Sequence, residues 1–207
     1  MGKGVIMGFI LRRRKCVIGA IMGCGLCLRL VIFVQMNNYI DPLFFEKEIF
    51  KPRTLLLQEN RVCDTIYFIN TGCIRTWFNQ DGRDITLQFF FENDEITSLE
   101  SLLYGNPSSF NIETVEQCEV YTLSRVNFFL SLEDSSTKQW FFEKAIKKMC
   151  VHSNRLLSLL KNKPAERYKE LLENNPEIVK RIPQHQIASY LGITSVSLSR
   201  IRNRCKG

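Results

Sequence analysis

The stretch QIASYLGITSVSLSRIRNR, residues 186–204, combines arginines with small polar side chains at helical spacing. Leu198 and Ile201 would both lie on the buried side of a helix in this stretch. The residues expected on or beside its protruding side are Thr194, Ser195, Val196, Ser197, Ser199, Arg200, Arg202, Asn203 and Arg204. Arginine can pair with guanine, serine and asparagine can bond to base edges or phosphates, and valine can contact a thymine methyl group. This face therefore predicts recognition of double-stranded DNA in the major groove, and the alternative is a solvated terminal helix.

Two short helices joined by a tight turn would position this face. Ala188 is small where the two helices would cross, so they can approach closely. Gly192 falls between them, where a left-handed residue is needed. Thr194 or Ser195 is suited to cap the second helix. The spacing predicts a helix-turn-helix motif, preceded by a helix that opens at Pro164 and by a short linking helix or turn.

A long helix is expected immediately upstream. No glycine or proline occurs between Glu133 and Pro164, which predicts a helix of about 28 residues and about 42 Å. Its apolar positions recur at alternating spacings of four and three, with one polar break. The members of this seam are Phe142, Ile146, Met149, Ser153, Leu156 and Leu160. The pattern predicts pairing with the same helix of a second copy in a homodimer, and the alternative is a helix packed on its own barrel.

Short apolar runs rich in β-branched and aromatic residues fill the region from Thr54 to Ser124. Turn residues separate the runs, and Asp81-Gly82 between two of them indicates a tight hairpin, because glycine tolerates the positive φ of a primed turn. Many short strands at close spacing predict an antiparallel sandwich or barrel, in the form of a jelly roll. The expected fold class is therefore α+β, with strands first and helices after.

Charge divides the 207 residues into three blocks. Residues 1–35 have a net charge of +6, residues 36–160 of −5, and residues 161–207 of +6. A basic block on a folded module attracts polyanions, although a solvated helix face has the same composition. The eight cysteines are scattered, which is typical of reduced thiols in a cytoplasmic protein. No nucleophile–base pair, metal-ligand cluster or glycine-rich phosphate loop is evident, so we expect no enzymatic activity, no cofactor and no metal.

The first 35 residues differ from the rest. RRRK precedes 19 apolar residues that contain a single charge, Arg29. This layout resembles a signal anchor, although Arg29 within the apolar run disfavours it, and the alternative is translation that starts at Met36. Membrane contact is expected only if residues 1–35 are part of the protein. Cys24 and Cys27, with Cys16 and Cys118, could supply four thiolates to an iron–sulfur cluster, and the alternative is unligated thiols in an apolar helix.

The strings IYFINTGCIRTWFNQDGRDITLQFFFEND and QIASYLGITSVSLSRIR resemble the cyclic-AMP receptor protein / fumarate-and-nitrate regulator (Crp/Fnr) family, in particular its Bacteroidetes-type members. The resemblance implies a homodimeric transcriptional regulator on a palindromic operator, with an effector of unknown identity in the barrel and RNA polymerase as a further partner. It places the base-reading positions on Ser195, Val196 and Arg200. The implied parts are an N-terminal extension (1–35), a cyclic-nucleotide-binding-like barrel (36–132), a dimerisation helix (133–162) and a winged-helix-like DNA-binding domain (163–207) whose wing is short or missing.

The effector region departs from the family pattern. Cyclic-nucleotide binders carry an arginine for the phosphate, and no arginine occurs here between Arg83 and Arg125. We therefore expect no tight binding of cyclic AMP, and a pocket lined by Phe, Ile and Leu that takes an apolar ligand or none. The two histidines, His152 and His185, lie outside the predicted barrel. The competing function is a small-ligand sensor, membrane-tethered or soluble, that does not bind specific DNA.

Overall fold

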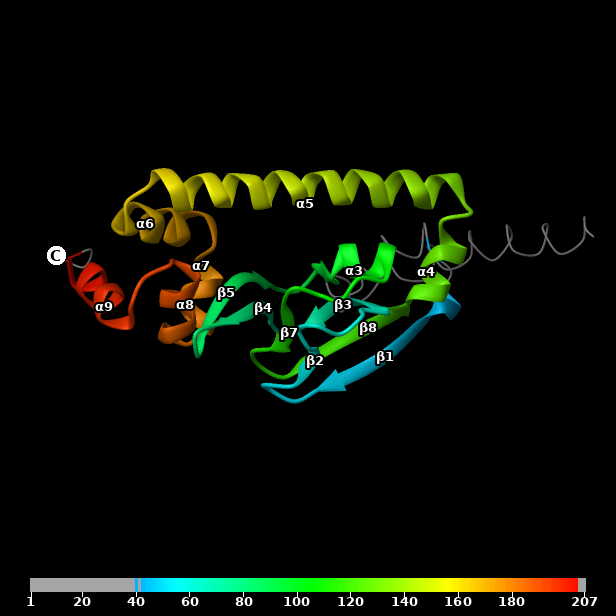
Figure 1. Ribbon diagram of the computed structural model, residues 1–207, viewed down its shortest axis with the longest axis horizontal. Coiled ribbons are helices and arrows are strands. Elements are labelled where there is room, and N and C mark those ends of the chain that lie inside the picture. Colours follow the sequence, from blue (N-terminus) through cyan, green and yellow to red (C-terminus); the bar gives the residue numbers. More distant parts are fainter. Residues whose placement is uncertain (1–39, 41, 205–207) are drawn as a thin grey trace, which may run out of the picture. The chain divides into compact units, whose positions relative to one another are not determined.

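The computed structural model describes residue 40 and residues 42–204, and two four-stranded antiparallel sheets form its N-terminal half (Figure 1). One sheet has the strand order β1-β8-β3-β6 and the other β2-β7-β4-β5. The strands are β1 (Phe45–Phe50), β2 (Leu55–Leu57), β3 (Thr65–Thr71), β4 (Ile74–Gln80), β5 (Arg83–Phe90), β6 (Glu95–Ile96), β7 (Asn111–Thr114) and β8 (Cys118–Ser124). The predicted jelly roll is confirmed.

The predicted hairpin lies between β4 and β5. Gln80 pairs with Arg83, so only Asp81 and Gly82 form the loop. Their φ angles are 51° and 79°. Positive φ at both loop residues is the geometry of a type I′ turn, whose twist matches that of the flanking strands.

Five elements of the barrel region were not predicted. Strand β1 was missed because its central residues are charged and exposed. The two-residue strand β6 is too short to show a pattern. The short helices α3 (Leu99–Tyr104) and α4 (Arg125–Ser131) follow β6 and β8, and a 3₁₀ turn, η1 (Pro42–Phe44), precedes β1. The barrel core lies between the sheets, where Ile69, Ile74 and Ile112 are fully buried.

Helix α5 (Ser135–Lys161) has 27 residues, as the lack of glycine and proline predicted. The Asp134 side chain caps it by accepting a hydrogen bond of 2.9 Å from the backbone N–H of Thr137. Individual side chains on one side of α5 contact the barrel and α4. Near its start Phe141 lies edge-on to Phe128, with ring centroids 4.8 Å apart, and further along Lys148 forms an ion pair of 3.1 Å with Glu95.

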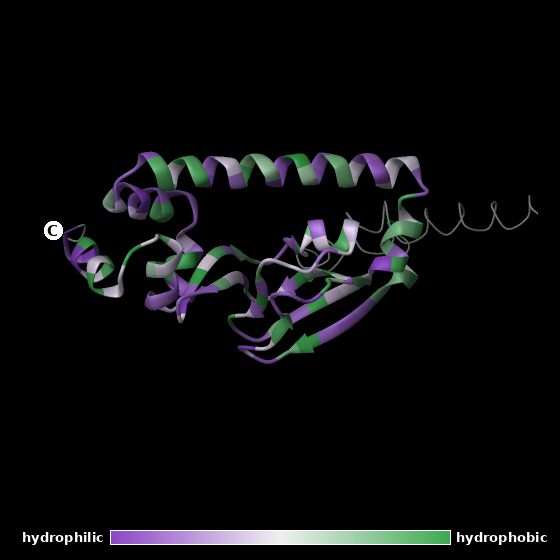
Figure 2. Cartoon of the chain, in the orientation of Figure 1, coloured by the Kyte–Doolittle hydropathy of each residue, from purple (hydrophilic) through white to green (hydrophobic). Residues whose placement is uncertain are grey.

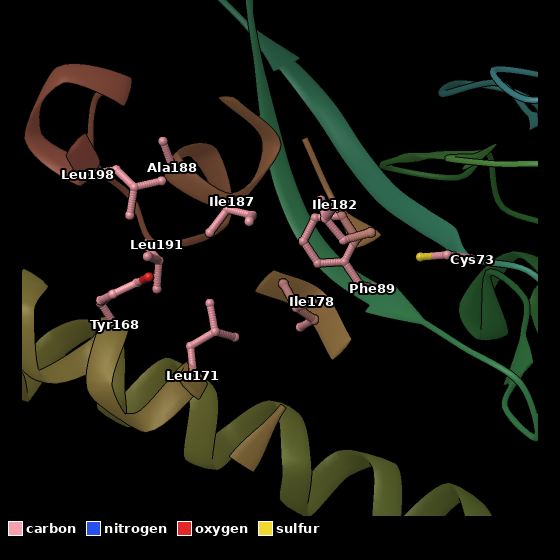
Figure 3. Packing of buried hydrophobic residues seen from close by; sticks show 10 residues of the cluster. All are labelled: Cys73, Phe89, Tyr168, Leu171, Ile178, Ile182, Ile187, Ala188, Leu191 and Leu198. Carbon is pink, nitrogen blue, oxygen red and sulfur yellow. The ribbon is translucent and has the colours of Figure 1, made fainter. Parts of the chain in front are cut away.

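Four helices follow α5, and they share one apolar core (Figure 3). They are α6 (Pro164–Asn174), α7 (Pro176–Arg181), α8 (Gln184–Tyr190) and α9 (Ser195–Arg204). Prolines at the first helical positions of α6 and α7 set their starts, as predicted for Pro164, because the missing N–H is not needed there. The core also includes Phe89 from β5 and Cys73 next to β4. The C-terminal helices are therefore packed against the barrel as well as against one another.

Candidate nucleic-acid interface

Helix α9 presents an exposed polar and basic face. Leu198 is only 1% exposed and Ile201 is half-buried, so the inward side is the predicted one. The exposed members of the predicted set are Thr194, Ser195, Val196, Ser199, Arg200, Asn203 and Arg204, and the half-buried members are Ser197 and Arg202. Within residues 42–204, no ion pair involves Arg200 or Arg204. Their charges are thus available to a polyanion.

The turn between α8 and α9 has the predicted geometry. Gly192 adopts a φ of +66°, a conformation that side-chain-bearing residues rarely adopt. The Thr194 hydroxyl accepts a hydrogen bond of 3.2 Å from the backbone N–H of Ser197, so Thr194 is the residue that caps α9. The Ser197 hydroxyl is bonded to that of Thr194 at 3.0 Å. Ser197 therefore takes part in the cap, and this reduces its freedom to contact a ligand.

Helix α8 lies against β5 of the barrel. The Ser189 hydroxyl accepts a hydrogen bond of 2.9 Å from the backbone N–H of Thr86 and donates one of 2.6 Å to the carbonyl of Asp84. Beside these bonds, the rings of Tyr190 and Phe89 are in contact, with centroids 5.3 Å apart. Sequence reasoning missed this contact, because nothing local in the chain links residues about a hundred positions apart.

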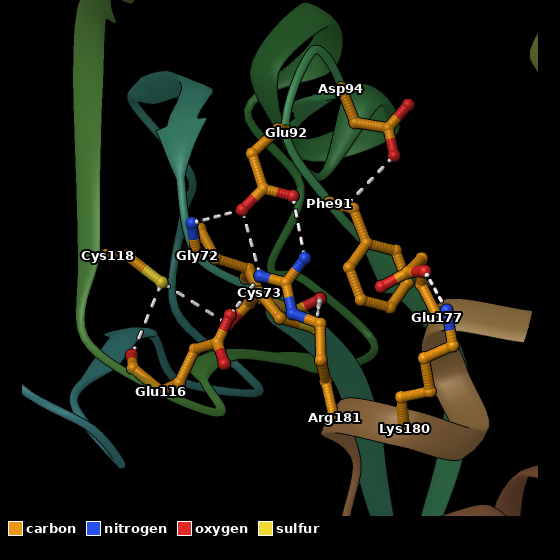
Figure 4. Close-up of polar contacts among 11 residues, drawn as sticks. Gly72, Cys73, Phe91, Glu92, Asp94, Glu116, Cys118, Glu177, Lys180 and Arg181 are labelled. Atoms are coloured by element: carbon orange, nitrogen blue, oxygen red, sulfur yellow. Dashed lines mark hydrogen bonds and ion pairs between the residues drawn. The ribbon is translucent and has the colours of Figure 1, made fainter.

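An ion network joins α7 to the barrel (Figure 4). Both carboxylate oxygens of Glu92 accept hydrogen bonds of 2.8 Å from Arg181, which also donates to Glu116. Glu92 accepts a third bond from the backbone N–H of Gly72. Burial alone would raise the pKa of Glu92, but these hydrogen bonds outweigh it and lower the pKa below its ordinary value. Bonding to Glu92 in turn raises the pKa of Arg181, opposed only in part by burial.

The side of α5 that faces away from the barrel carries the predicted seam. Its hydrophobic residues recur along the whole helix in Figure 2. Phe142 is 61% exposed and Leu160 is 75% exposed, and the other seam positions, Ile146, Met149, Ser153 and Leu156, are also exposed. An uncovered apolar stripe of this length is unusual on a protein surface. Pairing of two such helices in a homodimer stays a prediction.

A cavity of about 390 Å³ opens in the barrel beside β1, β2, β3 and β8. Its walls are Phe44, Glu46, Glu48, Phe50, Leu55, Leu56, Thr65, Tyr67, Thr122, Ser124 and Asn127. Phe44, Phe50, Leu55 and Leu56 are its apolar members, and β1 and β8 add carboxylate and hydroxyl side chains. An effector pocket lined by Phe, Ile and Leu stays a prediction. Burial, with a smaller contribution from nearby acidic groups that include Glu48, raises the pKa of Tyr67 to about 12.

Comparison with known proteins agrees with this architecture. Residues 47–134 match the family model of the cyclic nucleotide-binding domain. FixK2 from Bradyrhizobium japonicum is 17% identical, with a TM-score of 0.67 over 77% of this chain and 83% of that one. A structure described as a transcriptional regulator of the Crp/Fnr family, from Eubacterium rectale, is 18% identical, with a TM-score of 0.65 over 78% of each chain. This is the Crp/Fnr fold. The c-di-GMP-responsive regulator CLP from Xanthomonas campestris shares it at 14% identity, with a TM-score of 0.64 over 86% of this chain and 90% of that one.

No curated protein matches the chain by sequence. The similarity to Crp/Fnr structures therefore defines the fold, and the Bacteroidetes-type assignment stays a prediction.

The cavity beside β1, β2, β3 and β8 offers a cyclic phosphate no cationic partner. Its walls include Glu46 and Glu48 but neither arginine nor lysine. The hydroxyls around α3 already have partners inside the protein: Ser101 accepts from the backbone N–H of Cys63 at 2.7 Å, and Ser108 donates to the carbonyl of Phe110 at 2.8 Å. These residues do not fit the anionic part of a cyclic nucleotide.

Of the four cysteines suggested for an iron–sulfur cluster, Cys118 is the one that lies in the described part of the chain. Cys118 is fully buried, and its thiol donates to the carbonyls of Cys73 and Glu116, both at 3.3 Å. Burial raises its pKa to about 11, which disfavours the thiolate that a metal requires. Residues 42–204 hold no group of side chains suited to a metal ion. Cys16, Cys24 and Cys27 lie outside the described residues.

The anchor prediction for residues 1–35 and the alternative start at Met36 also fall outside the described residues. Within the described part of the chain, no helix is long and apolar enough to cross a membrane. The longest of these helices, α5, carries charged residues throughout its length.

Proposed function

We propose that the chain is a DNA-binding transcriptional regulator that acts as a homodimer. The observation that carries this proposal is the exposed face of α9, on which Arg200, Ser199 and Val196 protrude while Leu198 fixes the opposite side. Helices α8 and α9 would act as a helix-turn-helix, with α9 in the major groove. Arg200 is the residue expected to pair with guanine, and Arg204 to contact phosphate.

The exposed seam of α5 supports the homodimer. Two copies paired along this stripe would cover its apolar residues and bring two α9 helices to one side of the assembly. A dimer of this kind binds half-sites about one helical turn of DNA, about 34 Å, apart. The preferred operator is therefore expected to be palindromic.

We further propose that cyclic AMP is not the effector. Two carboxylates and no cation line the barrel cavity, and burying a cyclic phosphate there would leave it without a partner. Titration of the chain with cyclic AMP by calorimetry is expected to show no heat of specific binding. Submicromolar binding would contradict the proposal.

Selection of bound duplexes from a random library, followed by gel-shift titration of the winning sequence, tests the function. Arg200→Ala should lose about 1–3 kcal/mol of discrimination at one base position. Arg61→Ala is the matched control, since Arg61 is an exposed arginine of the barrel. The groove assignment is wrong if Arg200→Ala selects the same sequence with the same affinity as wild type. A wild-type chain that enriches no sequence and binds no duplex at low salt points instead to the ligand-sensor alternative.

A further inference from the structure

A second cavity, of about 410 Å³, lies where the C-terminal helices meet the barrel. It is bounded by the later part of α5, by α6 and α8, and by β5, which gather near one end of α5 in Figure 1. Its walls are Gln88, Val151, Asn154, Arg155, Ser158, Leu159, Arg167, Glu170, Leu171, Asn174, Asn175, Tyr190 and Leu191. The walls share no residue with those of the barrel cavity, so the two spaces are separate.

The guanidinium of Arg155 is held rigidly in this cavity. It stacks on the ring of Tyr190, 3.4 Å from the centroid, and Nη2 donates to the Tyr190 carbonyl at 2.9 Å. Nη1 is buried and has no hydrogen-bond partner. Burial lowers the pKa of Arg155 to about 10, so the group is still cationic at neutral pH. Among the described residues no carboxylate forms an ion pair with it.

A second unpartnered atom lines the same space. The side-chain oxygen of Gln88, on β5, is buried and accepts no hydrogen bond. Buried polar atoms are nearly always paired in folded proteins, so two such atoms on the walls of one cavity call for an explanation. A ligand that accepts from Arg155 and donates to Gln88 would pair both atoms.

The other charged groups of the cavity are already satisfied. Glu170 accepts hydrogen bonds from the Ser158 hydroxyl, at 2.7 Å, and from the side chain of Asn162. The guanidinium of Arg167 donates to the carbonyls of Leu191 and Asn162. Arg155 is thus the charged group of this cavity with an unused donor, and guanidinium groups bind carboxylates and phosphates best.

We propose that this cavity binds a small oxyanion that also carries a hydroxyl group, such as a phosphate monoester or a hydroxycarboxylate. The anionic oxygens would accept from Arg155 Nη1 and the hydroxyl would donate to Gln88. Because β5 belongs to the barrel and Arg155 to α5, an occupied site stabilises the packing of the C-terminal helices on the barrel. This proposal does not depend on the proposed DNA-binding function, because its test measures binding of a small anion and not of DNA.

Calorimetric titration of the full chain with inorganic phosphate and, separately, with L-malate tests the site and distinguishes the two anion classes. At least one probe should bind wild type and raise its melting temperature. Arg155→Gln should weaken that binding at least tenfold, because it removes the positive charge but keeps a hydrogen-bond donor. Arg61→Gln removes an exposed arginine elsewhere and should bind as wild type. Equal binding by wild type and Arg155→Gln, or no binding of either probe to wild type, overturns the proposal.

A crystallographic measurement on wild type keeps the test decisive if Arg155→Gln fails to fold. Arsenate carries a hydroxyl as phosphate does, and its anomalous scattering locates it directly. We expect an arsenate peak within hydrogen-bonding distance of Arg155 Nη1 and Gln88. Arsenate bound only at other positions contradicts the assignment.

Discussion

Arg181 of α7 and Glu92, two residues beyond the end of β5, form a double hydrogen bond in which both donor–acceptor distances are 2.8 Å. Their pairing joins the C-terminal helices to the barrel across about ninety residues of sequence. Glu92 also accepts from Gly72, whose φ of +107° and close neighbours leave no room for a side chain. The Glu92 side chain therefore connects the barrel, the turn at Gly72 and helix α7.

The ion pair between Arg181 and Glu92 should make the free energy of unfolding decrease at acidic pH. The folded-state pKa of Glu92 is below its ordinary value of 4.5, so the unfolded chain binds more protons. The stabilisation is complete above the ordinary value and is lost as pH falls through the lower folded value. Urea unfolding from about pH 6.5 to about pH 3 should show this loss in wild type and a flatter curve in Glu92→Gln. Glu177→Gln is the control, because its exposed pair with Lys180 contributes little. Parallel curves for Glu92→Gln and wild type would contradict the assignment.

Gly192→Ala should destabilise the chain by about 1–2 kcal/mol, because alanine resists the left-handed conformation that this turn requires. Steric overlap contributes nothing: the atoms nearest to an added Cβ, on Leu159 and Arg167, are at ordinary contact distances of 3.8 and 3.9 Å. Thermal unfolding measures the loss. Gly192→Asn should lose less, since asparagine tolerates positive φ, and an equal loss for both variants would show that backbone strain is not the cause.

Ile146→Glu should prevent formation of the proposed homodimer without unfolding the barrel. Ile146 is 54% exposed on the side of α5 that faces away from the barrel. A carboxylate buried in the paired seam should raise the dissociation constant roughly a hundredfold, equivalent to about 2.8 kcal/mol. Sedimentation equilibrium measures it. Lys169→Glu changes charge at an exposed position of α6 and should leave the dimer intact. An unchanged mass for Ile146→Glu rules out this seam as the interface.

Arg204→Ala should weaken binding to every DNA sequence by a similar factor. Arg204 is exposed at the end of α9, where a phosphate contact is expected and a base contact is not. The slope of log affinity against log salt should become less steep by about 1 per subunit. Gel-shift titrations at several salt concentrations give this slope. A loss confined to one base position, with the slope unchanged, would assign Arg204 to base reading instead.

Local chemistry made much of the fold predictable. Asp81-Gly82 specified its turn, Gly192 the turn before α9, and the absence of glycine and proline the length of α5. Strand β1 escaped prediction because Glu46 and Glu48 point into an open cavity and break the apolar alternation. The face of α9 followed from the spacing of Leu198 and Ile201, since helical periodicity is a local property.

Long-range contacts could not be predicted in the same way. The bonds of Ser189 to β5, the pairing of Arg181 with Glu92 and the burial of Arg155 Nη1 without a hydrogen-bond partner arise only when distant segments pack together. The spacing of these residues in the sequence does not indicate their long-range contacts. Ser189, for example, cannot be distinguished by sequence from any small residue in a short helix.

The position of Ser189 has a consequence for misassembly. Strand β5 is the last strand of its sheet, and one side of its backbone has no neighbour among the strands that the structure describes. Ser189 caps that open edge by bonding to the amide of Thr86 and the carbonyl of Asp84. When α8 leaves the barrel, the bare edge is free to recruit strands from other molecules. Damage to the packing of α8 should therefore appear first as aggregation that increases with protein concentration.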